Sequence, residues 1–278
     1  MGLEVRNNAT ALNTMKRMNG HQKAFSKTFN HLSSGLRIAE AADDPSGLAM
    51  ADDMDTKRKV LEAARRNAND GISVLQTMDS ASEEVFSILS RQREIAVQSS
   101  SEVLEQDQRQ YLQNEFSNLQ KEITRIAENV HFNDIKLSNG NQSAMNVQVG
   151  SHNTSASRIK IELGDLRASS MQASAGVSYT GVDNLANARE TLTGITEVMD
   201  VLNSHRTRYG AAEGRMQNAI DNLDTYSQSL TSSLSNIEDA DVAKETAEMT
   251  KYQILTQAST AVLGQAGSMA EGARRLLP

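Results

Sequence analysis

Side chains that could carry catalytic chemistry are present, but their spacing forms no recognisable site. The chain has no cysteine, which excludes disulfides and thiolate chemistry. Neither a glycine-rich phosphate loop nor a Ser/His/Asp elbow appears. The histidines are scattered without metal-ligand spacing, at His21, His31, His131, His152 and His205. We therefore expect no enzyme, no metal and no cofactor.

Acidic residues are concentrated in one stretch and are followed at once by basic ones. This alternation favours a solvated or subunit-facing charge pattern over a catalytic cluster of carboxylates. The net charge of −7 and the pI of about 5.3 argue against a nucleic-acid partner. The stretch contains Asp43, Asp44, Asp52, Asp53 and Asp55, then Lys57, Arg58, Lys59, Arg65 and Arg66.

The chain shows neither membrane nor signal-peptide patterns. No run approaches eighteen apolar residues, so we expect no membrane insertion. The first residues lack a basic start, an apolar stretch and a small-residue cleavage site. We expect no cleaved signal peptide.

The composition indicates long helices. Aromatic residues make up only 4% of the chain, and its two prolines are Pro45 and Pro278. Apolar residues recur every three or four positions, which predicts helices. The first stripe runs from Met15 to Leu36 and stops at the breaker-rich residues 42–47. This spacing predicts extended helix packing.

Heptad rows predict coiled-coil seams in the middle of the chain. One row runs from Leu61 to Ala96, a second from Ala64 to Gln92, and the longest from Ala188 to Ile237. A helix near residues 112–130 adds a further stripe. Gly71 lies on a seam despite the preceding Asn-Asp, so we predict an unbroken helix there, in which the missing side chain lets another helix approach closely.

A β-hairpin interrupts the helical pattern. Residues 145–149 and 159–163 alternate apolar and polar side chains across a polar loop, which predicts two short strands. Residues 167–180 are rich in Ser, Ala and Gly and suggest a surface crossing.

Four stretches resemble bacterial flagellin, and they occur in that family's order. Together they cover nearly the whole chain. They are His31-Leu-Ser-Ser-Gly-Leu-Arg-Ile38 with residues 41–50, Arg66-Asn-Ala-Asn-Asp-Gly-Ile-Ser73, Arg93-Glu-Ile-Ala-Val-Gln98 with His131-Phe-Asn133, and Asn236-Ile-Glu-Asp-Ala-Asp241 with residues 253–263.

The resemblance implies a mainly α fold of long helices in coiled-coil packing, with a small β-hairpin and paired chain ends. It implies an inner assembly domain of residues 1–43 plus 236–278 and a helical domain of residues 44–235, without outer variable domains. Glu4, Arg274 and Arg275 depart from the family pattern near the ends.

The implied function is structural: the chain would polymerise into the flagellar filament for motility. We assign assembly to the terminal stripes, whose members are Phe25, Phe29, Leu32, Leu36, Leu255, Val262, Met269 and Leu276. The hook–filament junction protein of the same family is the alternative, and a coiled-coil scaffold is a weaker one that explains neither the hairpin nor the ordered motifs.

The resemblance also implies partners and a location. The partners would be further copies of the chain, a flagellar export chaperone, the filament cap and the hook-associated junction proteins. The protein would be secreted into the filament without signal cleavage. Residues Arg91, Ile95 and Glu115 match positions through which some flagellins contact the flagellin-sensing toll-like receptor, with isoleucine in place of the family's leucine.

Overall fold

The protein is mainly helical, as the apolar periodicity predicts. The computed structural model describes the backbone of residues 9–179 and 181–275, with side chains over these ranges except at 270, 271 and 273–275. The chain forms two compact units: the terminal-helix unit, residues 1–58 and 228–278, and the central unit, residues 59–227. These boundaries fall within helices α2 (Pro45–Ser99) and α5 (Leu185–Glu238), whereas the resemblance implies boundaries at 43/44 and 235/236.

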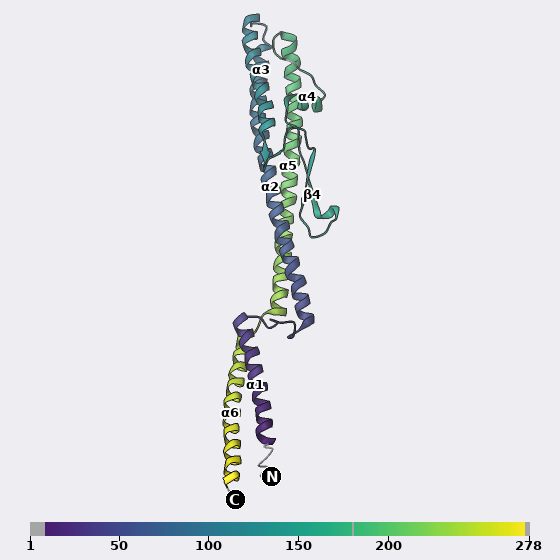
Figure 1. The fold of residues 1–278 in the computed structure, drawn as a ribbon. Helices are drawn as coiled ribbons and strands as arrows, with labels where there is room; N and C mark the ends of the chain where they lie inside the picture. Colours follow the sequence, from purple (N-terminus) through teal and green to yellow (C-terminus); the bar gives the residue numbers. More distant parts are fainter. Residues whose placement is uncertain (1–8, 180, 276–278) are drawn as a thin grey trace. The chain divides into compact units, whose positions relative to one another are not determined.

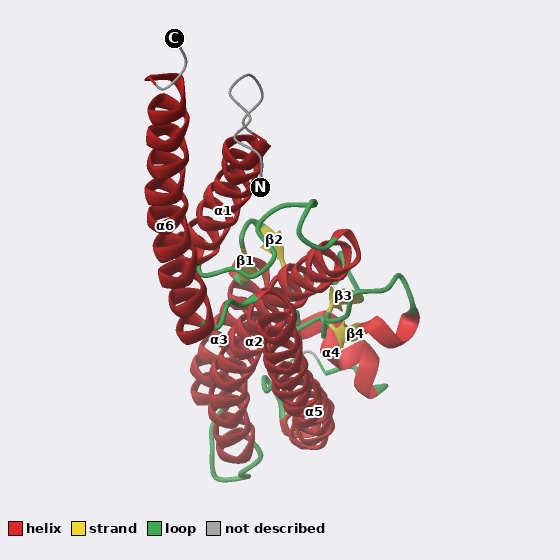
Figure 2. Ribbon diagram, turned by 90° about the horizontal axis from the view of Figure 1, so that it is seen from below, coloured by secondary structure: helices red, strands yellow, loops and turns green. Residues whose placement is uncertain are grey.

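The terminal-helix unit contains α1 (Ala9–Ser34) and α6 (Val242–Arg275), which lie side by side (Figures 1 and 2). Gly35 ends α1 with a left-handed φ of 74°, a conformation that glycine adopts without steric cost. The Asp241 carboxylate caps α6 by accepting hydrogen bonds from the backbone N–H groups of Ala243 and Lys244. Local capping interactions thus determine where α1 ends and where α6 begins.

The central unit is built on α2, α5 and α3 (Gln106–Asn129). The heptad seams predicted on α2 and α5 are buried here, and together with α3 they form the hydrophobic core. None of the helices in the described ranges is long and apolar enough to cross a membrane. The buried rows include Leu61, Ala68, Leu75, Ser82, Leu89 and Ala96 on α2, and Ala188, Ile195, Leu202, Tyr209 and Met216 on α5.

Buried Arg109 organises the turn between α2 and α3. Its guanidinium donates from Nε to the Ser99 carbonyl at 3.0 Å, from Nη1 to Leu104 at 2.8 Å and from Nη2 to Ser101 at 2.6 Å. The carbonyls at the C-terminal end of a helix lack helical partners. Arg109 therefore satisfies backbone groups at the end of α2 and in the turn that follows.

The predicted hairpin is confirmed as β3 (Ala144–Gln148) paired antiparallel with β4 (Arg158–Glu162). A one-turn 3-10 helix, η1 (Ser155–Ser157), precedes β4. The buried face of the hairpin packs on α2 and α5 in a second hydrophobic cluster. A Cβ on Gly71 would lie 2.7 Å from Met216 Sδ and 3.1 Å from Val147 Cγ2, so the unbroken helix and the close approach at Gly71 are also confirmed.

Two elements differ from the sequence analysis. A two-residue turn with positive φ at Asn133 and Asp134 joins the short strands β1 (His131–Phe132) and β2 (Ile135–Lys136). The Ser-rich crossing, whose composition suggests only a surface segment, contains a helix, α4 (Ala168–Ala175). Met171 of α4 is buried in the core, and this packing stabilises a helix too short to persist alone.

Candidate functional site

The pairing of α1 with α6 is the centre of the terminal-helix unit. The ring of His21 on α1 lies 6.3 Å from that of Tyr252 on α6, and Thr260 Oγ1 lies 3.9 Å from Met18 Sδ. With His31 near Glu245, these contacts show that the two helices run antiparallel. The contact row of α6 is half-buried and mixed in polarity, with Glu245, Met249, Tyr252, Thr256, Ser259, Leu263 and Ala266 at heptad spacing.

Two of the predicted assembly residues on α6, Val262 and Met269, lie outside this contact row. Leu255, Phe25 and Leu32 are half-buried, but Phe29, Val262 and Met269 are 53%, 49% and 62% exposed. Leu276 lies outside the described residues. Thus Val262 and Met269 do not serve as the face that α6 presents to α1, because the mixed polar row occupies that place.

Leu36 is also placed differently from expectation. It follows the end of α1 and forms an isolated antiparallel bridge with Asp239. Beside it, Arg37 N donates to the Glu238 carbonyl at 2.6 Å and Ala240 N to that of Gly35 at 2.9 Å. Because α1 ends at Gly35, Leu36 is not part of the helix. It lies in a set of backbone hydrogen bonds that joins the end of α1 to the α5–α6 junction.

Exposed apolar side chains gather on the outward faces of both terminal helices. Leu12, Met15 and Phe29 recur on one side of α1, and Ile254, Val262 and Met269 on one side of α6. We call these six residues the outer apolar rows. Soluble monomers rarely expose contiguous apolar surface unless it mediates an interaction. The rows therefore mark a surface that another molecule covers.

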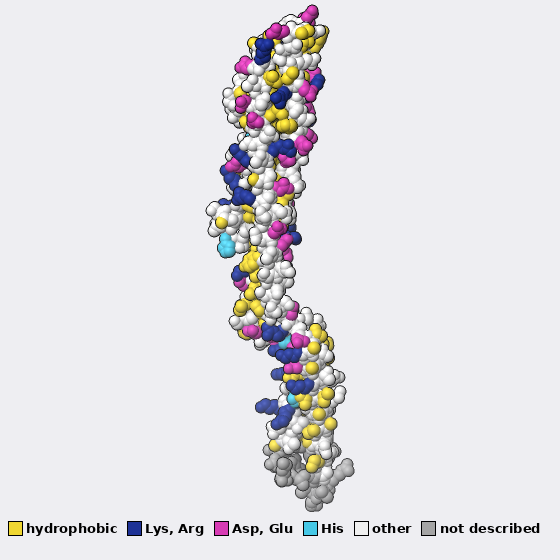
Figure 3. Space-filling view, turned by 180° about the vertical axis from the view of Figure 1, so that it is seen from behind, with side chains coloured by type: hydrophobic (Ala, Val, Ile, Leu, Met, Phe, Trp, Pro, Cys, Tyr) yellow, Lys and Arg dark blue, Asp and Glu magenta, His cyan; other side chains and the backbone are white. Residues whose placement is uncertain are grey.

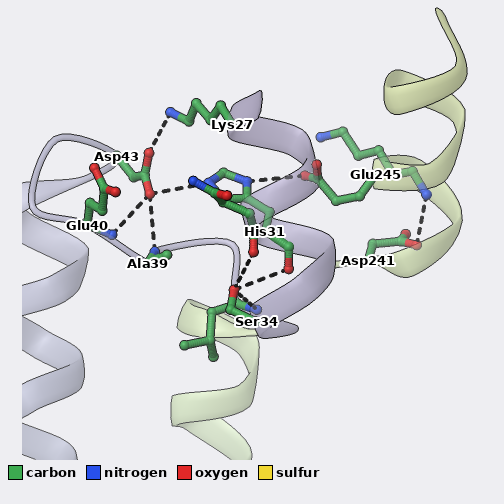
Figure 4. A network of polar contacts seen from close by, with 11 residues as sticks. Lys27, His31, Ser34, Ala39, Glu40, Asp43, Asp241 and Glu245 are labelled. Atoms are coloured by element: carbon green, nitrogen blue, oxygen red, sulfur yellow. Dashed lines mark hydrogen bonds and ion pairs between the residues drawn. The ribbon is translucent and has the colours of Figure 1, made fainter. Parts of the chain in front are cut away.

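A polar network fastens the loop after α1 (Figure 4). Asp43 Oδ1 lies 2.6 Å from Lys27 Nζ, and Asp43 Oδ2 lies 3.2 Å from His31 Nε2. Oδ2 also accepts hydrogen bonds from the backbone N–H groups of Ala39 and Glu40, both at 3.1 Å. The other imidazole nitrogen of His31 lies 3.7 Å from Glu245 Oε1 on α6. His31 thereby connects the loop to the second terminal helix.

The electrostatics of this network favour an ionised Asp43. The Lys27 ammonium holds the pKa of the Asp43 carboxyl well below its usual range, against the opposing effect of burial. The backbone N–H groups of Glu40 and Ala39 and the His31 ring lower that pKa further. We infer that a permanent carboxylate anchors the loop at the pH of most environments.

The three candidate receptor residues differ in solvent exposure. Arg91 donates to Glu115 Oε1 from Nε at 3.0 Å and from Nη2 at 2.8 Å, across α2 and α3. Both side chains are about half exposed. Ile95 is only 1% exposed and belongs to the core of the central unit. The Ile95 side chain therefore faces inward in the folded chain, and a receptor contact through Arg91, Ile95 and Glu115 stays a prediction.

Sequence reasoning missed the Asp43 network and the outward direction of the apolar rows. The network depends on a loop that folds back over α1, which no local pattern encodes. The apolar rows were visible as heptad stripes, but a stripe alone does not reveal what covers it.

Comparison with known proteins independently supports the resemblance to bacterial flagellin. Two family models match: the bacterial flagellin N-terminal helical region over residues 5–143 and the bacterial flagellin C-terminal helical region over residues 192–276. Flagellin of Halalkalibacterium halodurans is 37% identical, covering 98% of this chain and 99% of its own. Flagellin of Bacillus subtilis is 35% identical, covering 99% and 100%. A crystal structure of Bacillus cereus flagellin, 22% identical, shares the fold with a TM-score of 0.50 over 57% of this chain and 88% of its own.

Proposed function

Because this chain belongs to the bacterial flagellin family, it is a structural subunit of the flagellar filament, and we propose that its terminal-helix unit supplies contacts through which copies polymerise. The observation that carries the proposal is the pair of outer apolar rows on α1 and α6. Burial of apolar surface between subunits would stabilise the polymer by about 25 cal/mol per Å² removed from water.

The experiment that tests this proposal removes apolar character without touching the monomer's core. Val262→Asn combined with Met269→Gln changes two exposed side chains of α6, so the monomer should keep its helical content by circular dichroism. We expect polymerisation of the purified double variant to fail or to need a much higher protein concentration. Val103→Asn, at a site in the central unit that is 90% exposed, is the matched control and should assemble normally. Normal filaments from the α6 variant would contradict the proposal.

The two alternative functions, a hook–filament junction protein and a coiled-coil scaffold, have less support. The relatives of Halalkalibacterium halodurans and Bacillus subtilis match over nearly their whole length and are named flagellin, and neither favours the hook–filament junction protein. A coiled-coil scaffold would not account for matches to both terminal family regions.

We further propose that the subunit reaches the filament through the flagellar export channel with an intact N-terminus, and that it meets an export chaperone, the filament cap and the hook-associated junction proteins on the way. These steps are inferred from family membership. N-terminal sequencing of extracellular protein should find Met1 or Gly2 first. The removal of twenty or more residues would contradict this route.

Recognition by the flagellin-sensing toll-like receptor is also proposed, with Arg91 and Glu115 as the contact pair. Their mutual ion pair is exposed, while Ile95 is buried in the core of the central unit. We expect purified monomer to activate reporter cells and Arg91→Ala to reduce that activation about tenfold. Arg125→Ala, an exposed arginine of another surface pair on α3, serves as the control. Silence of the wild-type monomer at a saturating dose would contradict the proposal.

A further inference from the structure

Helix α1 carries positive charge without any carboxylate. Residues 9–34 contain four basic side chains, Lys16, Arg17, Lys23 and Lys27, and neither Asp nor Glu. The acids of the terminal-helix unit instead concentrate where its helices begin and end. These acids include Glu40, Asp43, Asp44, Asp52, Asp53 and Asp55, with Glu238, Asp239, Asp241, Glu245 and Glu248.

The lysines border a groove on the outer face of α1. Positions 16, 20, 23 and 27 recur at spacings of four and three, which places them on one face of the helix. Gly20 leaves a gap between Lys16 and Lys23: apart from its chain neighbours and the backbone of its own helix, no atom lies within 4 Å of where its Cβ would be. Two hollows of about 430 and 660 Å³ follow this face and share Asn19 and Lys23 in their lining. We call this face the lysine groove.

Most of these cations have no acidic partner in the part of the chain that the structure describes. Among the described residues, Lys16, Arg17 and Lys23 have no carboxylate within ion-pair distance, whereas Lys27 is paired with Asp43. Leu12 and Met15 border the same groove, so its floor combines apolar and cationic groups. Figure 3 shows basic side chains along one edge of the terminal-helix unit, next to a strip of hydrophobic ones. An acidic partner with an apolar contact would complement this face.

Such a complement exists on the same chain. At the start of α2, Met50 is 51% exposed, Asp52 is exposed, and the side chain of Asp53 is 63% exposed. Met50 and Asp53 are three residues apart and share a helix face. Asp53 Oδ2 lies 2.6 Å from Lys57 Nζ on the same helix, but both side chains of this pair are exposed and such a pair contributes little. Met50 and Asp53 therefore offer an apolar and an acidic group that match the apolar and cationic groups of the lysine groove.

Resting on the proposed function, we propose that the lysine groove of one subunit binds the Met50–Asp53 segment of a second copy. The two surfaces are different parts of the chain, so the contact is heterologous. A heterologous contact that does not close into a ring repeats without limit and produces an open filament. Charge complementarity would also steer the incoming subunit and fix its orientation.

The first test neutralises the groove. Lys16→Gln with Lys23→Gln should raise the critical concentration for polymerisation about tenfold at low salt, because two interface charges are lost. It should also flatten the dependence of polymerisation on NaCl, which screens the same interaction. Lys136→Gln with Lys160→Gln removes two exposed lysines of the central unit and should stay within about twofold of wild type. Identical behaviour of the two double variants would overturn the proposal.

The second test exchanges the charges. Lys23→Asp should block growth, and Asp53→Lys in the same chain should restore it, because each interface regains one opposite pair. Failure of this rescue would overturn the assignment of Asp53 even if the groove variant is defective. Failure of the wild-type protein to polymerise would instead contradict the proposed function itself.

A third measurement separates a lipid partner from a second subunit. Wild-type monomer is sedimented with vesicles of phosphatidylglycerol and with vesicles of phosphatidylcholine. We expect little binding to either. Strong binding to the anionic vesicles that is lost in the Lys16/Lys23 variant, with unchanged polymerisation, would identify a membrane surface and overturn the proposal.

Discussion

At the scale of single residues, Asp43 holds the loop after α1 by charge. Its carboxylate meets Lys27, His31 and two backbone N–H groups, and it is only 11% exposed. Hydrogen bonds to charged groups contribute more to stability than neutral ones, about 1.5–3 kcal/mol. Asp43 therefore links the position of α1 to the protonation of one side chain.

This arrangement predicts acid sensitivity in the terminal-helix unit. The pKa of Asp43 is lowered on folding, so its contribution is present above the unfolded pKa of about 3.9 and is lost as pH falls below it. Asp43→Asn should destabilise the unit by about 2 kcal/mol at neutral pH and remove this acid dependence. Hydrogen exchange of α1 amides measures both effects. Asp70→Asn, at an exposed site of α2, is the control, and equal protection in the two variants would contradict the role of Asp43.

His205 predicts a second pH effect, in the central unit. Burial lowers the pKa of His205, Arg208 lowers it further and Glu162 opposes them. The ring stacks on Tyr209 with centroids 6.4 Å apart, and it lies near Gly164, which follows β4. The neutral imidazole is favoured in the folded state, so stability should fall as pH drops below about 6.5.

Urea unfolding of the central unit at pH 7.5 and pH 5 tests this effect. The midpoint should be lower at pH 5 in wild type, and His205→Gln should shrink that difference. His131→Gln replaces an exposed histidine on β1 and should leave the difference intact. The idea fails if the His205 variant keeps the full pH dependence.

At the scale of elements, the hairpin depends on a few buried side chains. Ile161 is fully buried between the hairpin and the helices, and the Gly164 N–H donates to the Tyr209 hydroxyl at 3.1 Å. An isolated two-stranded hairpin is marginally stable, so this packing maintains it. Packed interfaces tend to switch between discrete arrangements, which makes the hairpin a candidate for the element that changes filament curvature.

Ile161→Ala tests that role. The cavity should destabilise the central unit by about 2–4 kcal/mol and alter the curvature of filaments, while assembly continues. Lys160→Ala, on the exposed face of the same strand, should change neither property. Electron microscopy of filaments decides the outcome. A normal waveform would show that the hairpin only covers the helices and does not affect curvature. Complete loss of filaments would show that the hairpin is essential for assembly.

Close packing at Gly71 gives another prediction about elements. Alanine there would gain about 1 kcal/mol of helix propensity, but its Cβ would press on Met216 and Val147. Overpacking of this kind costs about 1–3 kcal/mol. We therefore expect Gly71→Ala to lower stability by about 1 kcal/mol in thermal unfolding, whereas Gly214→Ala, on α5 with open space around it, should raise it. A more stable Gly71 variant would show that the helices can separate at little cost.

At the scale of the whole molecule, the two units should be separable in function. The central unit has its own hydrophobic clusters, while α1 depends on α6 for its half-buried face. Deletion of residues 240–278 should therefore leave a soluble, folded monomer that cannot polymerise. Light scattering and circular dichroism measure the two properties. Filaments formed by the truncated chain would refute the assignment of assembly to the terminal helices.

The sequence by itself determined the elements whose pattern is local. The heptad rows of α2 and α5, the alternating strands of the hairpin and the seam position of Gly71 are repeated or paired signals, and the structure buries them as predicted. The order of four motifs also identified the family before any fold was known, because each motif combines several residues at set spacing.

Only the tertiary structure decided which partner each face meets. Apolar spacing predicts that a helix face is buried. The same spacing arises whether that face is buried within the chain or against another subunit. Hence Ile95 proved to be core, while Val262 and Met269 proved to face outward. The backbone bridge of Leu36 to Asp239 and the helix α4 likewise depend on what packs beside them. Contacts between residues distant in sequence, such as Asp43 with Lys27 or α1 with α6, arise from chain reversal, which local periodicity does not encode.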